Sequence, residues 1–214
     1  MKSRPRRLRQ VDVPEGESGK WKVVRFTVTE DDIALFNLRA SIHGGGRFMR
    51  PGTYTQLTRS GGGMFGDQIV MSDTPSEIRD HWELMGHANK GRLLVNGLGL
   101  GVVVQAVLDE PAVEHLTVVE KSEDVIALVA AHWRNRYGGR LTVICADALD
   151  WTPPKGRKFQ AVWHDIWDDI TADNLPTMHR LHRKYGRRCE WQGSWCRREC
   201  ERHRSLGFES GRRG

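Results

Sequence analysis

The stretch Leu93–Val104, LLVNGLGLGVVV, decides the fold of this 214-residue chain. Its apolar beginning is typical of a buried strand, and the valines at its end are typical of a buried helix. Between them stand Gly97, Gly99 and Gly101. Glycines at such a turn let the backbone come close to a ligand, whose polar groups then meet the amides that begin the helix. The same glycines could also serve only the close packing of helix on strand.

Strands and helices alternate from this turn onward. Apolar runs, and the helix start and stop signals around them, predict a mainly parallel sheet with right-handed crossovers and helices on both faces. We expect strands at Arg92–Asn96, His115–Glu120, Leu141–Cys145, Ala161–His164 and Arg188–Trp191, and helices at Val102–Leu108, Ser122–Arg136, Asp173–Tyr185 and Cys196–Arg204. The expected fold class is therefore α/β and Rossmann-like.

The first 72 residues have a different character. β-branched and aromatic residues predict short strands at Trp21–Thr29, Thr53–Thr58 and Gln68–Met71. We therefore expect two regions. Residues 1–72 form a basic leader and a β-rich accessory part, and residues 73–214 form a Rossmann-like cofactor-binding domain with a basic C-terminal tail.

A helix is expected where the second region begins. Thr74, followed by proline and three residues later by Glu77, has the pattern of a capping box. Ile78, Trp82 and Met85 then recur at helical spacing. The pattern predicts one continuous helix with these three side chains on its apolar face.

An acidic residue favours a ligand site at the glycine turn. Glu120 ends the second strand, nineteen residues after Gly101. Rossmann-type sites place a carboxylate there, and it accepts hydrogen bonds from ribose hydroxyls. An acid at a strand end is also simply a surface residue in many sheets. A dinucleotide fingerprint, G-x-G-x-x-G, would need glycine at Val102, so that pattern is not matched.

The arrangement G-x-G-x-G after a strand, with Glu120 after the second strand and Asp147 after the third, resembles the class I S-adenosylmethionine-dependent methyltransferases. The resemblance covers about residues 91–195 and implies that fold, with S-adenosylmethionine as cofactor. It implies contacts of the backbone at Asn96, Gly97, Gly99 and Gly101 with the methionine part, of Glu120 with the ribose, and of Asp147 and Ala148 with the adenine. The family often has an acid where this chain has Asn96, which keeps hydrogen-bonding capacity without the charge.

Acidic residues also follow the fourth strand, in AVWHDIWDDITAD, residues 161–173. Asp165 comes directly after the strand, so we expect it in the same crevice as the glycine turn. It is our candidate catalytic group, as a general base or as an anchor for a cationic substrate. Asp168 and Trp167 are candidate substrate contacts, with a solvated turn and simple packing as the alternatives. Asp173 is expected to be the N-cap of the next helix.

Asp165 and Asp168, in D-x-x-D spacing after FQAVWH, resemble the same strand end in the polyamine aminopropyltransferases, the spermidine synthase family. There the first acid is taken to deprotonate the attacking amine. The segment GDQIVMSDTPSEIRDH is loosely similar in layout. Two features depart from that family: only 49 residues follow Asp165, and NGLGLG replaces its GGGDGG-like loop.

The cysteines do not indicate a metal. Cys189, Cys196, Cys200 and His203 match no familiar zinc spacing, so we expect no metal site. Reduced thiols are the expected state of all four cysteines.

The net charge of +6 is unevenly distributed. Five of the first ten residues are basic, and residues 179–214 contain eleven Lys or Arg against four Glu, so the body is acidic. Basic ends can contact nucleic-acid phosphates, although a solvated tail is the more common explanation. No apolar h-region follows the basic N-terminus and no membrane segment is apparent, so we expect a cytoplasmic protein.

Three functions remain open on these grounds. The leading hypothesis is an S-adenosylmethionine-dependent methyltransferase that acts on an unidentified nucleophile. One alternative is aminopropyl transfer to a polyamine. The other is a non-catalytic protein of this fold that binds nucleic acid through its basic ends, which steep salt dependence would reveal.

Overall fold

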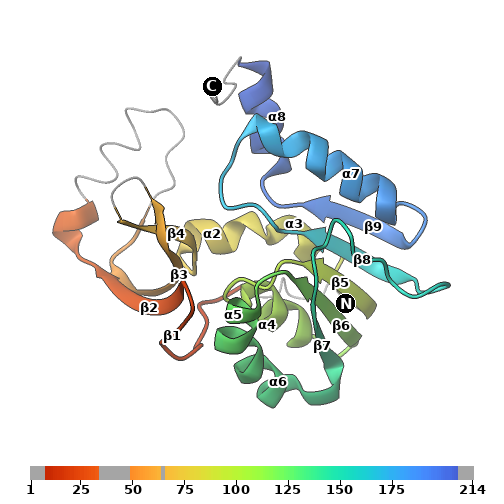
Figure 1. Ribbon diagram of the computed structural model, residues 1–214, viewed down its shortest axis with the longest axis horizontal. Helices are drawn as coiled ribbons and strands as arrows, with labels where there is room; N and C mark the ends of the chain where they lie inside the picture. Colours follow the sequence, from red (N-terminus) through yellow and green to blue (C-terminus); the bar gives the residue numbers. More distant parts are fainter. Residues whose placement is uncertain (1–7, 34–48, 64–65, 207–214) are drawn as a thin grey trace, which may run out of the picture.

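The computed structural model describes residues 8–33, 49–63 and 66–206, which form two sheets with helices around the larger one (Figure 1). The ends of the basic leader and of the basic tail, residues 1–7 and 207–214, lie outside the described residues. No helix in the described part of the chain combines the length and the apolar character needed to cross a bilayer.

The N-terminal sheet is an antiparallel meander. Its strands are β1 (Gly16–Ser18), β2 (Trp21–Val28), β3 (Gly52–Gly63) and β4 (Gly66–Ser72), in the order β1-β2-β3-β4. The three predicted strands are confirmed as β2, β3 and β4. Each strand pairs with its neighbour in sequence, which is the commonest arrangement of consecutive strands.

The second sheet is parallel throughout. Its strands are β5 (Gly91–Asn96), β6 (Val113–Glu120), β7 (Leu141–Cys145), β8 (Phe159–His164) and β9 (Cys189–Ser194), in the order β7-β6-β5-β8-β9. The order reverses between β5 and β8. An open sheet binds ligands at such a switch point, beyond the carboxyl ends of the strands.

Helices cover both faces of the parallel sheet (Figure 1). They are α2 (Pro75–Asp80), α3 (Trp82–Met85), α4 (Val102–Leu108), α5 (Glu123–Val125), α6 (Ala131–Tyr137), α7 (Leu175–Tyr185) and α8 (Arg197–Ser205). A π-helical segment, Ile126–Ala130, joins α5 to α6, and 3-10 turns lie at Gly138–Arg140 and Ala172–Asn174. The predicted Rossmann-like α/β fold is confirmed, and so is the separate β-rich N-terminal part.

Alternate residues of β5 show why both faces must be covered. Leu93 and Val95 lie in the core that α4 and α6 cover, while Leu94 lies in the core that α7 covers. Since side chains on a strand point to opposite faces in turn, a strand that is apolar at every position needs a helix on each side. Val23 of β2 and Leu57 of β3 belong to the first of these cores, so the N-terminal sheet packs onto the parallel sheet through shared apolar contacts.

The expected capping box differs in detail. Thr74 is the N-cap of α2, but its side chain makes no capping hydrogen bond. The Glu77 carboxylate does reach back, yet it accepts from the backbone N–H of Ser72, at 2.5 Å, rather than from that of Thr74. Glu77 therefore ties the end of β4 to the start of α2.

The prediction of one continuous helix with Trp82 on its apolar face was wrong. The helix breaks at His81, between α2 and α3, and 54% of Trp82 is exposed. His81 is turned inward instead, with 2% of its surface exposed, and its ring meets that of Trp163 edge-on at 6.2 Å. Burying this imidazole changes the helix register and leaves the following tryptophan on the surface.

The expected N-cap at Asp173 was also wrong. The Thr171 side chain accepts from the backbone N–H of Asp173 at 3.4 Å and caps the 3-10 turn that precedes α7. A threonine at this position satisfies one of the unpaired amides at the helix start.

Candidate active site

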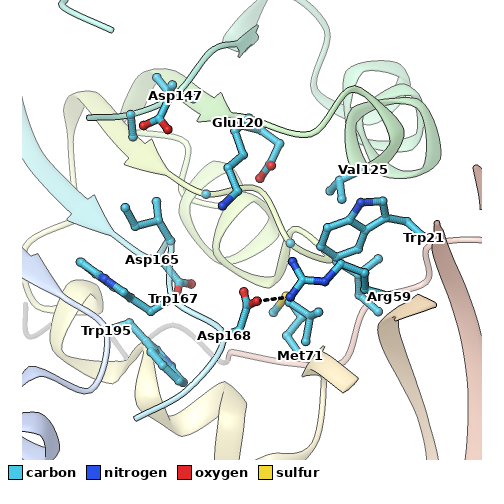
Figure 2. A pocket seen from close by; sticks show the side chains of 18 of the residues that line it. Trp21, Arg59, Met71, Glu120, Val125, Asp147, Asp165, Trp167, Asp168 and Trp195 are labelled. Carbon is cyan, nitrogen blue, oxygen red and sulfur yellow. Dashed lines mark hydrogen bonds and ion pairs between the residues drawn. The ribbon is translucent and has the colours of Figure 1, made fainter. Parts of the chain in front are cut away.

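A cavity of about 240 Å³ lies between the two sheets, at the carboxyl edge of the parallel one (Figure 2). Eight of the predicted site residues line it: Gly97, Gly99, Glu120, Asp147, Ala148, Asp165, Trp167 and Asp168. They come from four different strand ends. The parallel sheet thus brings together residues that are up to 71 positions apart in the sequence.

The glycine turn has no room for side chains. Gly97 has φ 101°, and a Cβ there would stand 1.8 Å from the carbonyl oxygen of Asp165. Gly99 has φ 50°, and a Cβ there would stand 2.1 Å from the sulfur of Met71. The same sulfur accepts the backbone N–H of Leu100 at 3.0 Å. Glycine at these two positions therefore lets the strand ends and β4 meet around the cavity.

Asn96 and Gly101, which we expected to contact a cofactor, do not line the cavity. The Asn96 side chain is fully buried, and its Nδ2 donates to Nδ1 of His164 at 2.8 Å. A Cβ on Gly101, at φ 79°, would stand 2.0 Å from Nε1 of Trp133. That nitrogen donates to the carbonyl of Leu100 at 3.0 Å. Both residues hold the turn in shape from behind.

Burial keeps the imidazole of His164 neutral and lowers its pKa to about 3, which suits its Nδ1 to accept from Asn96. The backbone carbonyl of Asn96 accepts the backbone N–H of Asp165 at 2.8 Å. The ends of β5 and β8 are therefore locked together beside the cavity.

The carboxylate of Glu120 is held by two backbone amides. Its Oε2 accepts from Leu98 N–H at 2.9 Å, and its Oε1 accepts from Ser122 N–H at 2.8 Å. Each oxygen keeps a further lone pair that can accept a ligand hydroxyl. Asp147 is fixed in a similar way, since its Oδ1 accepts from Leu149 N–H at 2.7 Å. The end of β6 therefore presents an oriented acceptor to the cavity.

Asp165 is a carboxyl group whose charge is disfavoured. Desolvation by burial, with a smaller contribution from the carboxylates of Asp80, Glu77 and Glu120, raises its pKa to about 8. The imidazole of His81 lies 3.8 Å from its Oδ2. A cation that entered the cavity beside Asp165 would favour the ionised form and drive off the proton.

Asp168 also faces the cavity, but a side chain of the N-terminal sheet pairs with it. Arg59 of β3 donates from Nη2 to Oδ2 of Asp168 at 2.9 Å (Figure 2). The same Nη2 donates to Gln68 at 2.6 Å, and the guanidinium lies over the ring of Trp21 at 5.4 Å. The second acid of the D-x-x-D pair is therefore partly neutralised.

Aromatic side chains form part of the cavity wall. Trp167 and Trp195 stand on the Asp165 side, opposite Trp21 (Figure 2). Trp163, the other tryptophan beside Asp165 in the sequence, is buried in the core, with its ring stacked on Trp191 at 6.2 Å. Large aromatic walls exclude water and offer flat surfaces to rings and cations.

The cavity favours a cationic ligand. Among the described residues, five carboxyl side chains line it, whereas Arg59 and Lys121 are the only lysine or arginine residues there. Electrostatic complementarity with such a lining favours positive charge on whatever binds. The carboxyl-bearing residues are Glu77, Glu120, Asp147, Asp165 and Asp168.

Sequence reasoning missed the contribution of the N-terminal sheet. It supplies six lining residues: Trp21, Leu57, Arg59, Ile69, Val70 and Met71. The layout similarity of GDQIVMSDTPSEIRDH is the one signal that pointed to this region. Nothing local marks Arg59 as a site residue, because its partner Asp168 is 109 positions away.

Within the described ranges, no three His, Cys, Asp or Glu side chains gather as a metal site would require. All four cysteines are free thiols. Burial raises the pKa of Cys189 and of Cys200, which makes them poorer nucleophiles.

No protein-family model matches the chain. Polyamine aminopropyltransferase 2 of Hyperthermus butylicus is 25% identical to it over 166 residues, which cover 74% of this chain. The match covers 52% of that relative, so the chain spans about half the length of the curated protein it resembles.

Solved structures with a similar arrangement include an S-adenosylmethionine-dependent methyltransferase from Clostridium acetobutylicum. It has 14% identity and a TM-score of 0.40 over 52% of this chain and 44% of that one. Precorrin 8W decarboxylase of Methanobacterium thermoautotrophicum has 15% identity and a TM-score of 0.41 over 59% of this chain and 70% of that one. These likenesses are of fold, and what the chain binds has to come from its own cavity.

Proposed function

We propose that this chain binds S-adenosylmethionine in the cavity and transfers its methyl group to a small nucleophile. The observation that carries the proposal is the meeting of Glu120, the glycine turn and Asp165 around one cavity. A ribose acceptor, a close backbone approach and a proton acceptor are the three parts that such a transfer needs.

The residues present fit this cofactor. Glu120 offers oriented lone pairs to ribose hydroxyls, and the apolar surfaces of Val119, Val125 and Ala148 suit a flat base. The carboxyl-rich lining complements a positive sulfonium. When bound, the cofactor supplies a carbon next to that sulfonium, which a nucleophile attacks in line.

The side chains of the cavity would then position the nucleophile and remove its proton. Asp165, in the ionised form that the cationic cofactor would favour, would accept the proton that the nucleophile loses, since its pKa of about 8 lies close to neutral pH. Trp167 and Trp195 would exclude water and limit the approach of the nucleophile to one direction. Such transfers depend mainly on positioning, which rigid strand ends provide.

Aminopropyl transfer is the second candidate. The excess of carboxyl groups in the cavity would suit an amine acceptor, and the relative from Hyperthermus butylicus carries that activity in its name. Two observations argue against it. The turn NGLGLG lacks the aspartate of the GGGDGG-like loop of that family, and Gly99 leaves no room for a side chain there. In addition, Asp168 is already paired with Arg59. Methyl transfer is therefore the function we favour.

Titration calorimetry of the purified protein tests both candidates. We expect binding of S-adenosylmethionine and S-adenosylhomocysteine, and weaker binding of the decarboxylated cofactor and of NAD. Glu120→Ala should weaken the first two about thirtyfold or more, because it removes a charge-assisted acceptor of two ribose hydroxyls.

Glu114→Ala is the matched control. Glu114 lies near the other end of β6 and is exposed, so its replacement should leave all affinities unchanged. Tighter binding of the decarboxylated form would favour aminopropyl transfer. No binding of any nucleoside, together with salt-sensitive binding of RNA or DNA, would contradict both and favour the nucleic-acid alternative.

A further inference from the structure

Arg59 brings a positive charge into a carboxyl-lined cavity. It belongs to β3, whereas the predicted cofactor contacts belong to the parallel sheet. In Figure 2, Asp147 and Arg59 lie on opposite sides of Glu120, and Arg59 is on the side of Met71 and Trp21. A nucleoside held at Glu120 and Asp147 would therefore have Arg59 beyond its ribose.

The glycine turn runs from the end of β8, where Gly97 lies against Asp165, to β4, where Gly99 lies against Met71. Gly99 touches Met71 of β4, and Met71 pairs in register with Leu57 of β3, two residues before Arg59. A ligand group that extended from the ribose along the turn would reach the wall that Met71 and Arg59 form. The amino-acid tail of S-adenosylmethionine is such a group, and it ends in a carboxylate.

Part of the guanidinium is available for that carboxylate. Both hydrogen bonds that Arg59 makes to other described side chains, to Asp168 and to Gln68, use Nη2. Nε–H and the two N–H groups of Nη1 remain as charged donors, each of which can bond one carboxylate oxygen of a ligand. The side chain is 32% exposed, so a ligand can approach it.

Trp21, Asp168 and Gln68 hold the guanidinium in place before any ligand arrives. A donor that is already oriented loses little conformational entropy when it binds. A lysine in the same place would carry the charge but would have all its donors on a single nitrogen.

We propose that Arg59 binds the α-carboxylate of S-adenosylmethionine and thereby selects this cofactor over its decarboxylated form. The inference rests on the proposed function and deepens it, because it assigns the discrimination between methyl and aminopropyl donors to one residue of the N-terminal sheet. It also gives that sheet a task in the site.

The test is titration calorimetry of the full chain with four probes. S-adenosylmethionine and S-adenosylhomocysteine carry the carboxylate, whereas decarboxylated S-adenosylmethionine and 5′-methylthioadenosine do not. Arg59→Gln should weaken the first two about tenfold or more and change the last two less than about twofold. Arg59→Lys should recover only part of the loss.

Two control variants separate ligand binding from structure. Asp168→Asn breaks the ion pair but keeps Arg59. Because Asp168 also lines the cavity, the affinities themselves can change, but the preference for S-adenosylhomocysteine over 5′-methylthioadenosine should remain. Arg92→Gln, at the opposite end of β5 and 47% exposed, should change nothing.

Three results would overturn the assignment. Loss of the preference for S-adenosylhomocysteine over 5′-methylthioadenosine in Asp168→Asn, to the same extent as in Arg59→Gln, would show that Arg59 acts only by joining the two sheets. Unchanged binding by Arg59→Gln, in a chain that does bind S-adenosylmethionine, would remove the assignment and leave the proposed function intact. If the unaltered chain bound none of the four probes, the proposed function itself would fail, and the role of Arg59 with it.

Discussion

Asp165→Asn is expected to be more stable than the unaltered protein, by a margin that grows as the pH rises. The same substitution removes the group that we expect to accept the proton. Asp165 has a pKa of about 8 in the fold, against 3.8 for an ordinary aspartate. Below the lower value the carboxyl is neutral in both states. Between the two values the unfolded chain loses the proton and the folded chain keeps it, so stability falls as the pH rises.

An asparagine does not titrate and escapes this loss. The stability advantage of Asp165→Asn should be small at pH 4, grow by at most about 1.4 kcal/mol per pH unit, and level off above pH 8. Because the side chain is 20% exposed to the cavity, we expect about 2 kcal/mol or more at pH 8 rather than the full amount.

Urea denaturation at pH 5 and pH 8 measures the effect. Asp169→Asn is the control, since this neighbouring aspartate is exposed and its replacement should change the stability little. An Asp165 variant with the same advantage at pH 5 and pH 8 would show that the carboxyl is already ionised at pH 5. The cation-induced release of its proton would then be excluded.

Gly97→Ala is expected to be the most destabilising single-methyl change in the cavity. Its Cβ would lie 1.8 Å from the Asp165 carbonyl oxygen, a backbone atom that cannot rotate away. The positive φ of 101° adds strain for any residue with a side chain. We expect the free energy of unfolding to fall by about 3 kcal/mol or more beyond the fall in the control variant described next, or the chain to fail to fold.

The control is Gly156→Ala. Gly156 also has a positive φ, 81°, but nothing lies within 4 Å of the position of its Cβ. Its replacement should lower the free energy of unfolding only by the cost of a left-handed backbone conformation, about 1 to 2 kcal/mol. The two variants are compared by urea denaturation, and a similar loss in both would mean that the ends of β5 and β8 are further apart than the structure shows.

Local patterns in the sequence predict most of the parallel sheet. The helix Val102–Leu108 was expected with the same bounds that the structure has, because its apolar run is flanked by glycine and by a turn. Strand ends at Glu120 and Asp165 could be placed as well, since carboxyl ends of parallel strands meet at one edge. These two placements put the predicted acids into one cavity.

Long-range packing accounts for what the sequence did not predict. Trp82 looked apolar-facing because helical spacing assumes an unbroken helix, and the burial of His81 against Trp163 breaks it. The role of Asn96 as a buried support depends on His164, 68 residues away. The ion pair of Asp168 depends on the packing of a second sheet, which no local pattern encodes.

The position of a residue in a turn therefore predicts its place in the fold better than it predicts which groups the residue contacts. The glycine turn was read as one unit in contact with a ligand, yet Gly97 and Gly99 face the cavity while Gly101 faces Trp133. Two of these glycines therefore line the cavity and the third makes room for a core tryptophan, a difference that only the three-dimensional structure reveals.

A crystal structure of the protein with S-adenosylhomocysteine would test the central claim most directly. We expect the ribose hydroxyls on Glu120, the adenine beside Asp147 and Ala148, and the thioether sulfur toward Asp165. Well-ordered ligand in any other part of the molecule, or an empty cavity in crystals soaked far above the measured dissociation constant, would contradict the proposal that this cavity is a cofactor site.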